Sequence, residues 1–351
     1  MPTFHDPERT IEFEFVRATE NAALNAMRWI GRGDKEAADA AACDAIYGVF
    51  DLVDIRGEVA IGEGIKDNAP GIFLGDKLGT WKESAPRFDI ALDPVDGTTN
   101  ISKGMANSIS VMSAVESPCG KRVMKNMPAF YTHKLSYGPR IDRAVRAAGL
   151  EHTLIDHPMS DVLELASQSL GKRIPELVVL ILDRPRNKQF IDAVREAGAS
   201  LRMVSDGDIT AAVAPSLPDS GVDLYVGIGG TPEGILTATA LRALGGDIQM
   251  RMWFKDEPSK ASELEDSIFP ADEISKVFTA EEIVPGESAI FCATGITDST
   301  LLPGVKLIGK TAITHSILMR ARSRTVRYIR AVHDLEHKTI HLRSDRADHK
   351  V

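Results

Sequence analysis

The segment FDIALDPVDGT, residues 88–98, joins an alternating apolar stretch to an acidic turn. Residues 88–92 alternate as a strand does, so Asp93 is expected at the carboxyl end of a strand, where ligand sites of α/β folds form. Pro94 fixes its own φ angle and predicts a turn that aims the carboxylates of Asp93 and Asp96 at one point. Two such carboxylates repel each other unless a cation lies between them, and hard oxygen ligands suit Mg²⁺ or Mn²⁺. The alternative is an ordinary surface turn, because Asp, Pro and Gly are common in turns.

Working outward from this segment, predicted strands and helices alternate along the chain. The run LVVLIL at 177–182 is continuously apolar, as in a strand covered on both faces. The alternation predicts layered α/β architecture. A chain of 351 residues suits two domains, and the break at His157-Pro158 divides it into residues 1–157 and 158–351. The predicted strands are 58–62, 88–92, 108–115, 176–182 and 224–226, and the predicted helices are 11–30, 35–53, 161–170, 190–197, 209–213 and 233–244.

The composition excludes several classes of protein. Apolar residues make up 43% and charged residues 26%, which is the balance of a folded chain rather than a disordered one. The net charge of -9 disfavours nucleic acid and anionic membrane as partners. The three cysteines are dispersed, so we expect no disulfide framework and a reducing, cytoplasmic location. No apolar run is long enough to cross a bilayer, and residues 1–8 do not read as a signal peptide.

Further carboxylates occur where a metal site would need them. Glu63 lies between two glycines after a strand, Asp39 lies beside the apolar stripe of its helix, and Glu233 opens a helix. A carboxylate beside an apolar stripe is costly unless it is paired with a cation. The ordinary alternatives are a tight turn for Glu63, a solvated edge position for Asp39 and a favourable helix-dipole partner for Glu233. Together they predict a polynuclear metal site, and phosphoryl chemistry fits such a site.

Basic and aromatic residues supply the second half of a candidate site. Arg184 and Arg186 follow the apolar strand that ends at Leu182, and Arg binds phosphate through two parallel hydrogen bonds. Lys188 adds charge nearby, although a basic loop after a strand is also common. Tyr131 either contacts a sugar or belongs to the core.

These segments together resemble the class II fructose-1,6-bisphosphatases. That family belongs to the lithium-sensitive phosphatase superfamily, along with inositol monophosphatases. The resemblance runs in order from about residue 11 to residue 329. The segments that carry it are GRGDK (31–35), IGEG (61–64), DPVDGT (93–98), RPR (184–186), DGD (206–208) and GIGGTPEG (227–234). The first and last are specific to class II, whereas 93–98 is shared across the superfamily.

The resemblance implies a layered α-β-α-β-α sugar-phosphatase fold in two domains. The implied reaction is hydrolysis of the 1-phosphate of fructose 1,6-bisphosphate, with two or more Mg²⁺ or Mn²⁺ ions per site and a homo-oligomer, dimer or tetramer. Thr98 would orient the attacking water, with Lys35 and Asp67 as supporting catalytic groups. The implied metal ligands are Asp39, Glu63, Asp93, Asp96 and Glu233. The implied substrate contacts are Asp96, Gly97, Thr98, Tyr131, Arg184, Pro185, Arg186, Asp206, Gly207, Asp208 and Gly230.

The chain departs from the family pattern at a few positions. Asp96 stands where many members have Glu, and the segment IKDNAP, residues 65–70, is less acidic than usual. These changes bear on metal preference and rate more than on the type of reaction. Two related activities stay open, a sedoheptulose-1,7-bisphosphatase and an inositol-monophosphatase-like enzyme, and the latter would not need Arg184 and Arg186.

Two other patterns predict different functions. The segment GVKLIGKT, residues 304–311, matches the P-loop letter for letter and would make the chain a nucleotide-binding protein. Its context disagrees, because residues 305–308 alternate like a strand and a turn precedes them. The arginines at 320, 322 and 324 suit an exposed strand or edge, and so a subunit contact or a solvated face. The histidines show no zinc-binding spacing.

Overall fold

The computed structural model describes residues 6–62, 71–118, 120–265, 267 and 269–344. The chain forms two compact units, Met1–Met124 with Gly286–Val351, and Lys125–Pro285. Each unit combines helices with a mixed sheet, as the α/β prediction requires. The predicted boundary at 157/158 falls inside the second unit, because the strand at 131–137 pairs with strands at 224–230 and 247–253.

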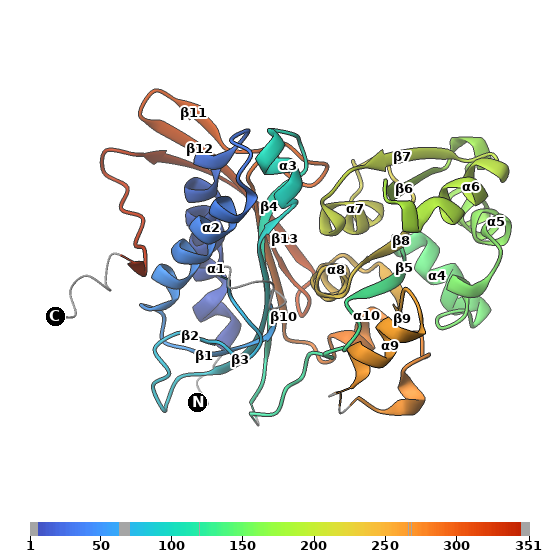
Figure 1. Ribbon diagram of the computed structural model, residues 1–351, viewed down its shortest axis with the longest axis horizontal. Coiled ribbons are helices and arrows are strands. Elements are labelled where there is room, and N and C mark those ends of the chain that lie inside the picture. The colour runs from blue at the N-terminus through green and yellow to red at the C-terminus, as the bar shows by residue number, and fades with distance from the viewer. Residues whose placement is uncertain (1–5, 63–70, 119, 266, 268, 345–351) are drawn as a thin grey trace. The chain divides into compact units, whose positions relative to one another are not determined.

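The first unit contains an eight-stranded sheet in the order β11-β12-β10-β4-β3-β1-β2, with β13 paired to β12. Only β1 and β3 run parallel among its pairs. Helices α1 and α2 cover one face of this sheet (Figure 1). The helices are α1 (Pro7–Ala26), α2 (Lys35–Phe50) and α3 (Thr98–Lys103), and the strands are β1 (Arg56–Ile61), β2 (Lys77–Leu78), β3 (Arg87–Asp96), β4 (Ile109–Glu116), β10 (Ala289–Gly295), β11 (Lys306–Ile308), β12 (Thr311–Arg320) and β13 (Thr325–Asp334).

The second unit contains a five-stranded sheet in the order β7-β6-β8-β5-β9. The strands β6, β7 and β8 run parallel, while β5 pairs antiparallel with β8 and β9. The strands are β5 (Tyr131–Tyr137), β6 (Val178–Leu182), β7 (Ser200–Val204), β8 (Leu224–Gly230) and β9 (Asp247–Trp253), and the helices are α4 (Pro139–Ala148), α5 (Met159–Leu170), α6 (Lys188–Glu196), α7 (Asp208–Val213), α8 (Thr231–Leu244), α9 (Glu257–Leu264) and α10 (Ala280–Ile283). Short 3₁₀ helices lie at Met27–Trp29 in the first unit and, in the second, at Leu154–Asp156, Ile174–Glu176, Pro185–Asn187, Ala214–Ser216 and Ala271–Glu273.

Helices cover both faces of the second sheet, which explains the unbroken apolar run in β6. Val179 and Ile181 pack with residues of α4, α5 and α6. Leu180 and Leu182 point the other way and pack with α7 and Tyr225. Figure 1 shows α4, α5 and α6 on one side of this sheet and α7 and α8 on the other. Because successive side chains of a strand alternate between faces, every position of β6 needs an apolar residue.

The predicted turn at Pro94 is wrong. β3 continues through Pro94 to Asp96, and its pairing with β4 shifts register between Asp93 and Asp96. Proline lacks the N–H that a regular ladder requires, so it is tolerated at such a bulge. The bulge, rather than a turn, redirects the acidic segment.

The predicted exposed strand at 320–324 is also wrong. β12 ends at Arg320, whose side chain is buried, and the chain turns before β13 begins. The Arg320 guanidinium donates from Nε to Glu8 Oε2 at 2.8 Å and from Nη2 to Asp6 Oδ2 at 2.8 Å. The first residue of this arginine series therefore fixes the start of α1 to the end of β12.

The segment that matches the P-loop forms a β-hairpin. β11 ends at Ile308, Gly309 turns with a φ of 60°, and Thr311 opens β12 opposite Ile308. A P-loop needs a strand, a loop and then a helix, so the nucleotide-binding interpretation fails on structure. None of the helices that the structure describes has the length and apolar character of a membrane span.

Candidate active site

The acidic segment of the first unit is held by the bulge in β3. The backbone N–H of Val95 donates to Asp93 Oδ1 at 3.0 Å, and Asp96 is 4% exposed. Gly97 follows with a φ of 89°, and a Cβ there would lie 2.5 Å from the carbonyl oxygen of Asn107. Only glycine fits this position, and it lets α3 begin at once with Thr98.

Helix α2 carries Asp39 and packs against β3 and α3. Asp39 is 8% exposed, as its place beside the apolar stripe predicted. The loop before α2 is tied to α3 by two backbone hydrogen bonds of 2.9 Å, from Gly31 N–H to Ile101 and from Gly33 N–H to Ser102. Lys35, the first residue of α2, is exposed at the end of this anchored loop.

The predicted metal ligands are distributed over the chain. Asp39, Asp93 and Asp96 lie on contacting elements of the first unit, whereas Glu233 belongs to the second unit. Glu63 and the predicted catalytic Asp67 lie outside the described residues. Among the residues that the structure describes, no group of three or more His, Cys, Asp or Glu side chains is gathered for a metal ion. The complete ligand set therefore stays a prediction.

The predicted substrate residues of the second unit meet at one edge of its sheet. The parallel strands β6, β7 and β8 end at Leu182, Val204 and Gly230. The segments 184–186 and 206–208 follow the first two of these strands. Tyr131 opens β5 directly opposite Gly230. The topology thus brings together the residues that the resemblance implied, at the carboxyl ends of parallel strands.

Two arginines of this edge are held in defined positions. The Arg184 Nη2 donates to Asp206 Oδ1 at 3.2 Å, and the Arg186 Nε donates to the carbonyl oxygen of Ile228 at 2.9 Å. The Arg186 guanidinium also lies over the Tyr131 ring, 4.5 Å from its centroid. Such a cation–π contact orients the guanidinium plane while leaving its Nη groups for a ligand.

Asn187 was missed by sequence reasoning, although it fixes the arginine loop to the sheet. Its Oδ1 accepts from the Ile228 N–H at 2.7 Å, and its Nδ2 donates to the Leu182 carbonyl at 3.0 Å. The side chain is fully buried. The signal in the sequence is weak, because an asparagine in a basic loop usually reads as a turn residue.

Trp253 was missed as well. It ends β9 directly opposite Tyr131, and the two rings meet edge to face with centroids 6.3 Å apart. The pairing register that joins these residues is set by tertiary structure, so sequence spacing does not reveal it.

Glu233 is a half-buried residue in the first turn of α8, and its Oε2 atom is buried. Its Oε2 has no hydrogen-bond partner among the described residues. Burial raises the pKa of Glu233, and the nearby Lys134 ammonium lowers it. A buried carboxylate oxygen that lacks a donor suits a hard divalent cation, so this residue fits the expected metal.

The glycines before Glu233 lie against carboxylates. A Cβ on Gly229 would lie 1.9 Å from Asp208 Oδ2, and one on Gly230 would lie 1.9 Å from Glu233 Oε2. Contacts this short do not occur in real structures. The glycine-rich segment 227–230 therefore lets two acidic side chains lie against the backbone.

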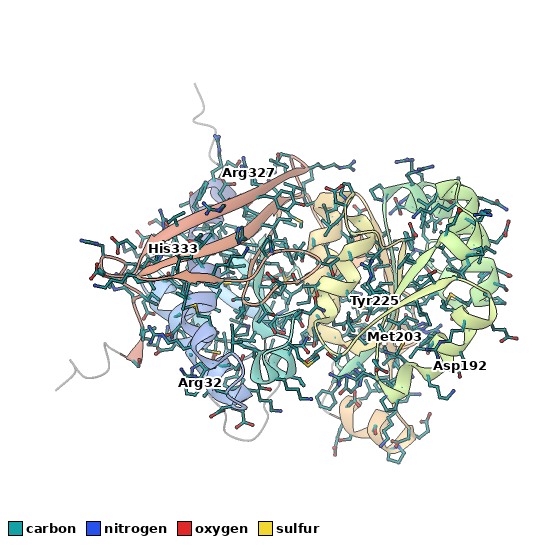
Figure 2. The ribbon with its side chains drawn as sticks, turned by 90° about the horizontal axis from the view of Figure 1, so that it is seen from above. Arg32, Asp192, Met203, Tyr225, Arg327 and His333 are labelled. Carbon is teal, nitrogen blue, oxygen red and sulfur yellow. The ribbon has the colours of Figure 1, made fainter. Side chains whose placement is uncertain are left out.

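Asp208 uses both of its carboxylate oxygens inside the protein. Oδ2 accepts from the Lys134 ammonium at 2.6 Å, and Oδ1 accepts from the Tyr225 hydroxyl. Burial and the Asp208 charge raise the pKa of Tyr225 well above its ordinary value, so this hydroxyl stays protonated and donates. Tyr225, labelled in Figure 2, is fully buried in β8. The Asp208 side chain is consequently occupied before any substrate binds.

Comparisons with known proteins identify the family of this chain. The family profile described as bacterial fructose-1,6-bisphosphatase, glpX-encoded, matches residues 9–333. The chain is 37% identical over 338 residues to "Fructose-1,6-bisphosphatase class 2" of Haemophilus influenzae, covering 93% of this chain and 97% of that protein. It is 36% identical over 340 residues to "Fructose-1,6-bisphosphatase 1 class 2" of Escherichia coli K12, covering 94% and 97%.

These matches place the chain among the enzymes that hydrolyse phosphoric monoesters. It belongs to the glpX-encoded, class II family of bacterial fructose-1,6-bisphosphatases. The resemblance drawn from the six sequence segments is thereby confirmed, and enzymes of this family are generally metal-dependent.

Proposed function

We propose that this chain hydrolyses the 1-phosphate of fructose 1,6-bisphosphate and releases fructose 6-phosphate and inorganic phosphate. The observation that carries the proposal is similarity along nearly the whole chain to two relatives that bear the name of this activity. In the reaction a water oxygen attacks phosphorus, the bond between phosphorus and the C1 oxygen breaks, and a proton passes to the departing alkoxide. Water is the only co-reactant.

The residues present fit a divalent cation, Mg²⁺ or Mn²⁺, through a donor set made only of carboxylates. The orphaned Glu233 Oε2 and the buried Asp39 and Asp96 support this assignment. We infer that Asp39, Glu63, Asp93, Asp96 and Glu233 hold the metal. When bound, the cation neutralises charge on the phosphate and lowers the pKa of the attacking water.

The first unit supplies groups for the reacting phosphate. The Gly97 backbone, held open by its positive φ, and the Thr98 N–H at the start of α3 are proposed to bind phosphate oxygens. The Thr98 hydroxyl orients the attacking water. Lys35, exposed on the loop anchored to α3, and Asp67 support proton transfer and charge balance in this proposal.

The second unit supplies groups for the sugar and the second phosphate. Arg186 is supported by its bond to Ile228 and by the Tyr131 ring, so its Nη groups meet the second phosphate in a preset orientation. Arg184 and Asp206 bind the sugar as an ion pair. Because the Asp208 carboxylate is engaged internally, the segment 206–208 contributes the Asp206 side chain and its backbone.

The activity is tested by phosphate release from fructose 1,6-bisphosphate, sedoheptulose 1,7-bisphosphate and inositol 1-phosphate, with Mg²⁺ or Mn²⁺. We expect turnover of the first substrate and a loss of at least about 1,000-fold in Asp93→Asn. Arg186→Met should lower kcat/KM for the bisphosphates by about 10- to 100-fold and leave kcat/KM for a monophosphate nearly unchanged. Arg143→Met, an exposed arginine of α4 in the same unit, is the matched control.

Full activity in Asp93→Asn would remove the metal-site assignment, and equal losses on bisphosphates and monophosphates in Arg186→Met would remove the second-phosphate assignment. Sedoheptulose 1,7-bisphosphate is the alternative substrate, since it presents the same two phosphates on a longer sugar. The five-layer α-β-α-β-α order, a cytoplasmic location and a homodimer or homotetramer belong to the same proposal and rest on the family likeness. Light scattering of the purified chain tests the last of these.

A further inference from the structure

Lys134 lies in the middle of β5 with a fully buried side chain. Its neighbour Leu135 packs with α4, α5 and α6, so Lys134 points to the opposite face, toward α7 and α8. Removing an ammonium from water costs several kcal/mol unless other groups compensate for the lost hydration. The hydrogen-bond partners of Lys134 must therefore compensate for this cost, and they indicate its role.

The ammonium contacts two segments of the candidate site. Its Nζ donates to Asp208 Oδ2 at 2.6 Å and to the carbonyl oxygen of Gly230 at 2.5 Å. Asp208 opens α7, and Gly230 ends β8 as the N-cap of α8. One cation thus joins the start of α7 to the start of α8.

The turn at Gly230 is closely packed against side chains of the candidate site. A Cβ on Gly230 would lie 1.9 Å from Glu233 Oε2, so any side chain there would displace the Glu233 carboxylate. The Lys134 Cε likewise lies against Gly234, where an added Cβ would be 3.0 Å away. The lysine side chain therefore passes along the first turn of α8, which carries the carboxylate expected to bind metal.

We propose that Lys134 is a positioning residue of this active site. Its ammonium holds Asp208 and the Gly230 carbonyl so that α7 and α8 begin in the register that presents the 206–208 backbone, Gly230 and Glu233 to the ligands. The inference rests on the proposed function. Lys134 touches neither substrate nor reacting atoms, and it acts through Asp208 and Gly230.

A structural ion pair is the competing explanation, and a charge-neutral double variant separates the two. Lys134→Met leaves Asp208 buried without its cation, and Asp208→Asn leaves the ammonium without its anion, so each single change should lower the unfolding midpoint. The pair Lys134→Met with Asp208→Asn buries no unpaired charge and should recover most of that midpoint. Because the link to Gly230 stays broken, its kcat should stay about 100-fold below the wild type.

The measurements are kcat and KM on fructose 1,6-bisphosphate, the urea unfolding midpoint, and calorimetric binding of fructose 6-phosphate without metal. We expect kcat to fall about 100-fold in the double variant, KM to change less than about 3-fold, and product binding to weaken about 10-fold. Lys172→Met is the matched control, because Lys172 also pairs with a largely buried aspartate, Asp223 at 2.6 Å, near the opposite ends of the strands. That variant should lose stability but keep kcat and product binding.

Recovery of kcat together with the midpoint in the double variant would overturn the proposal, since Lys134 would then serve the fold alone. Failure of the double variant to fold would overturn it equally, because the pair would be a requirement of the fold. A larger rise of KM in Asp208→Asn than in Lys134→Met would show that Asp208 contacts the substrate itself. A wild type that releases no phosphate from fructose 1,6-bisphosphate would instead refute the proposed function, and the product-binding comparison would still test Lys134.

Discussion

His133 is expected to make the unfolding free energy fall as the pH drops from 6.5 toward 4. The ring lies on β5 and stacks on Phe190, with centroids 4.7 Å apart and planes 22° apart. Burial, together with the nearby Arg251 charge, lowers the pKa of His133 from 6.5 to about 4, and the Asp156 charge opposes this change. The neutral imidazole is therefore the form that the fold accommodates.

The sign and size of the effect follow from linkage. An unfolded chain takes up a proton at His133 near pH 6.5, whereas the folded chain takes it up only near pH 4. The stabilising contribution is thus complete above pH 6.5 and is lost progressively as the pH falls toward 4. At pH 5 the two pKa values correspond to a loss of about 2 kcal/mol of unfolding free energy.

The assay is urea unfolding at pH 8 and pH 5 for the wild type and for His133→Phe, which keeps a flat ring against Phe190. We expect the wild type to lose about 2 kcal/mol more than the variant between the two pH values. His152→Phe, whose side chain is 52% exposed in the wild type, is the control and should keep the wild-type pH dependence. Equal pH dependence in wild type and His133→Phe would refute the reasoning, and water in the 220 Å³ cavity that His133 lines would then be solvating the imidazolium.

Four further predictions concern other parts of the chain. Arg320→Met should cost about 3–5 kcal/mol of unfolding free energy at pH 7, because it removes the nearer of the two cations beside the fully buried Glu8 and leaves only Arg322, whose Nε lies 3.5 Å from Glu8 Oε1; equilibrium denaturation measures this. Gly230 has a backbone φ of -63°, which alanine also adopts, so the fold should persist in Gly230→Ala. The added Cβ would displace the Glu233 carboxylate, and we expect kcat to fall about 100-fold in steady-state assays. Lys310→Ala should leave activity and any residual nucleotide binding unchanged, since its loop is a hairpin turn, and calorimetry with ATP would contradict this by showing a Lys310-dependent heat. Chelation by EDTA should abolish phosphate release, and added Mg²⁺ or Mn²⁺ should restore it.

The helices and strands with a clear apolar period could be predicted from the sequence. The helices of the first hundred residues, the buried strand β6 and the helix after Gly230 all lie within a few residues of their predicted bounds. Each buries one face or both faces in the interior of its unit, so its pattern of apolar residues reflects its environment.

The strand β5 shows why other elements were missed. Its sequence YTHKLSY carries a histidine and a lysine at positions that the structure buries largely or completely. Those polar residues are tolerated only because Lys134 finds Asp208 and His133 stays neutral. Asp208, which pairs with Lys134, and Phe190, on which His133 stacks, both lie far from β5 in the sequence. A local sequence pattern therefore cannot reveal them.

The residues of the candidate site likewise fall into those that the sequence could predict and those that it could not. The resemblance supplied the residues at the strand ends, and the parallel order of β6, β7 and β8 explains why they meet. It could not supply Lys134, Asn187 or Trp253, because these act by hydrogen bonds and register pairs across the sheet. It also implied a substrate contact at Asp208, which stays a prediction, and it could not reveal that this carboxylate accepts hydrogen bonds from Lys134 and Tyr225.

The order of strands in the first sheet has a consequence for biosynthesis. β4 is made early, yet its partner β10 begins at Ala289, after the entire second unit has been translated. Until then β4 is an open edge, and open edges are where nascent chains pair wrongly. The second unit is continuous in sequence and can assemble on the ribosome, whereas the first must wait for its carboxyl-terminal strands. Arg320 then joins the last strands to Glu8, near the start of the first helix made, and a ribosome that stalls before residue 289 would release a chain whose first sheet ends at an unpaired β4.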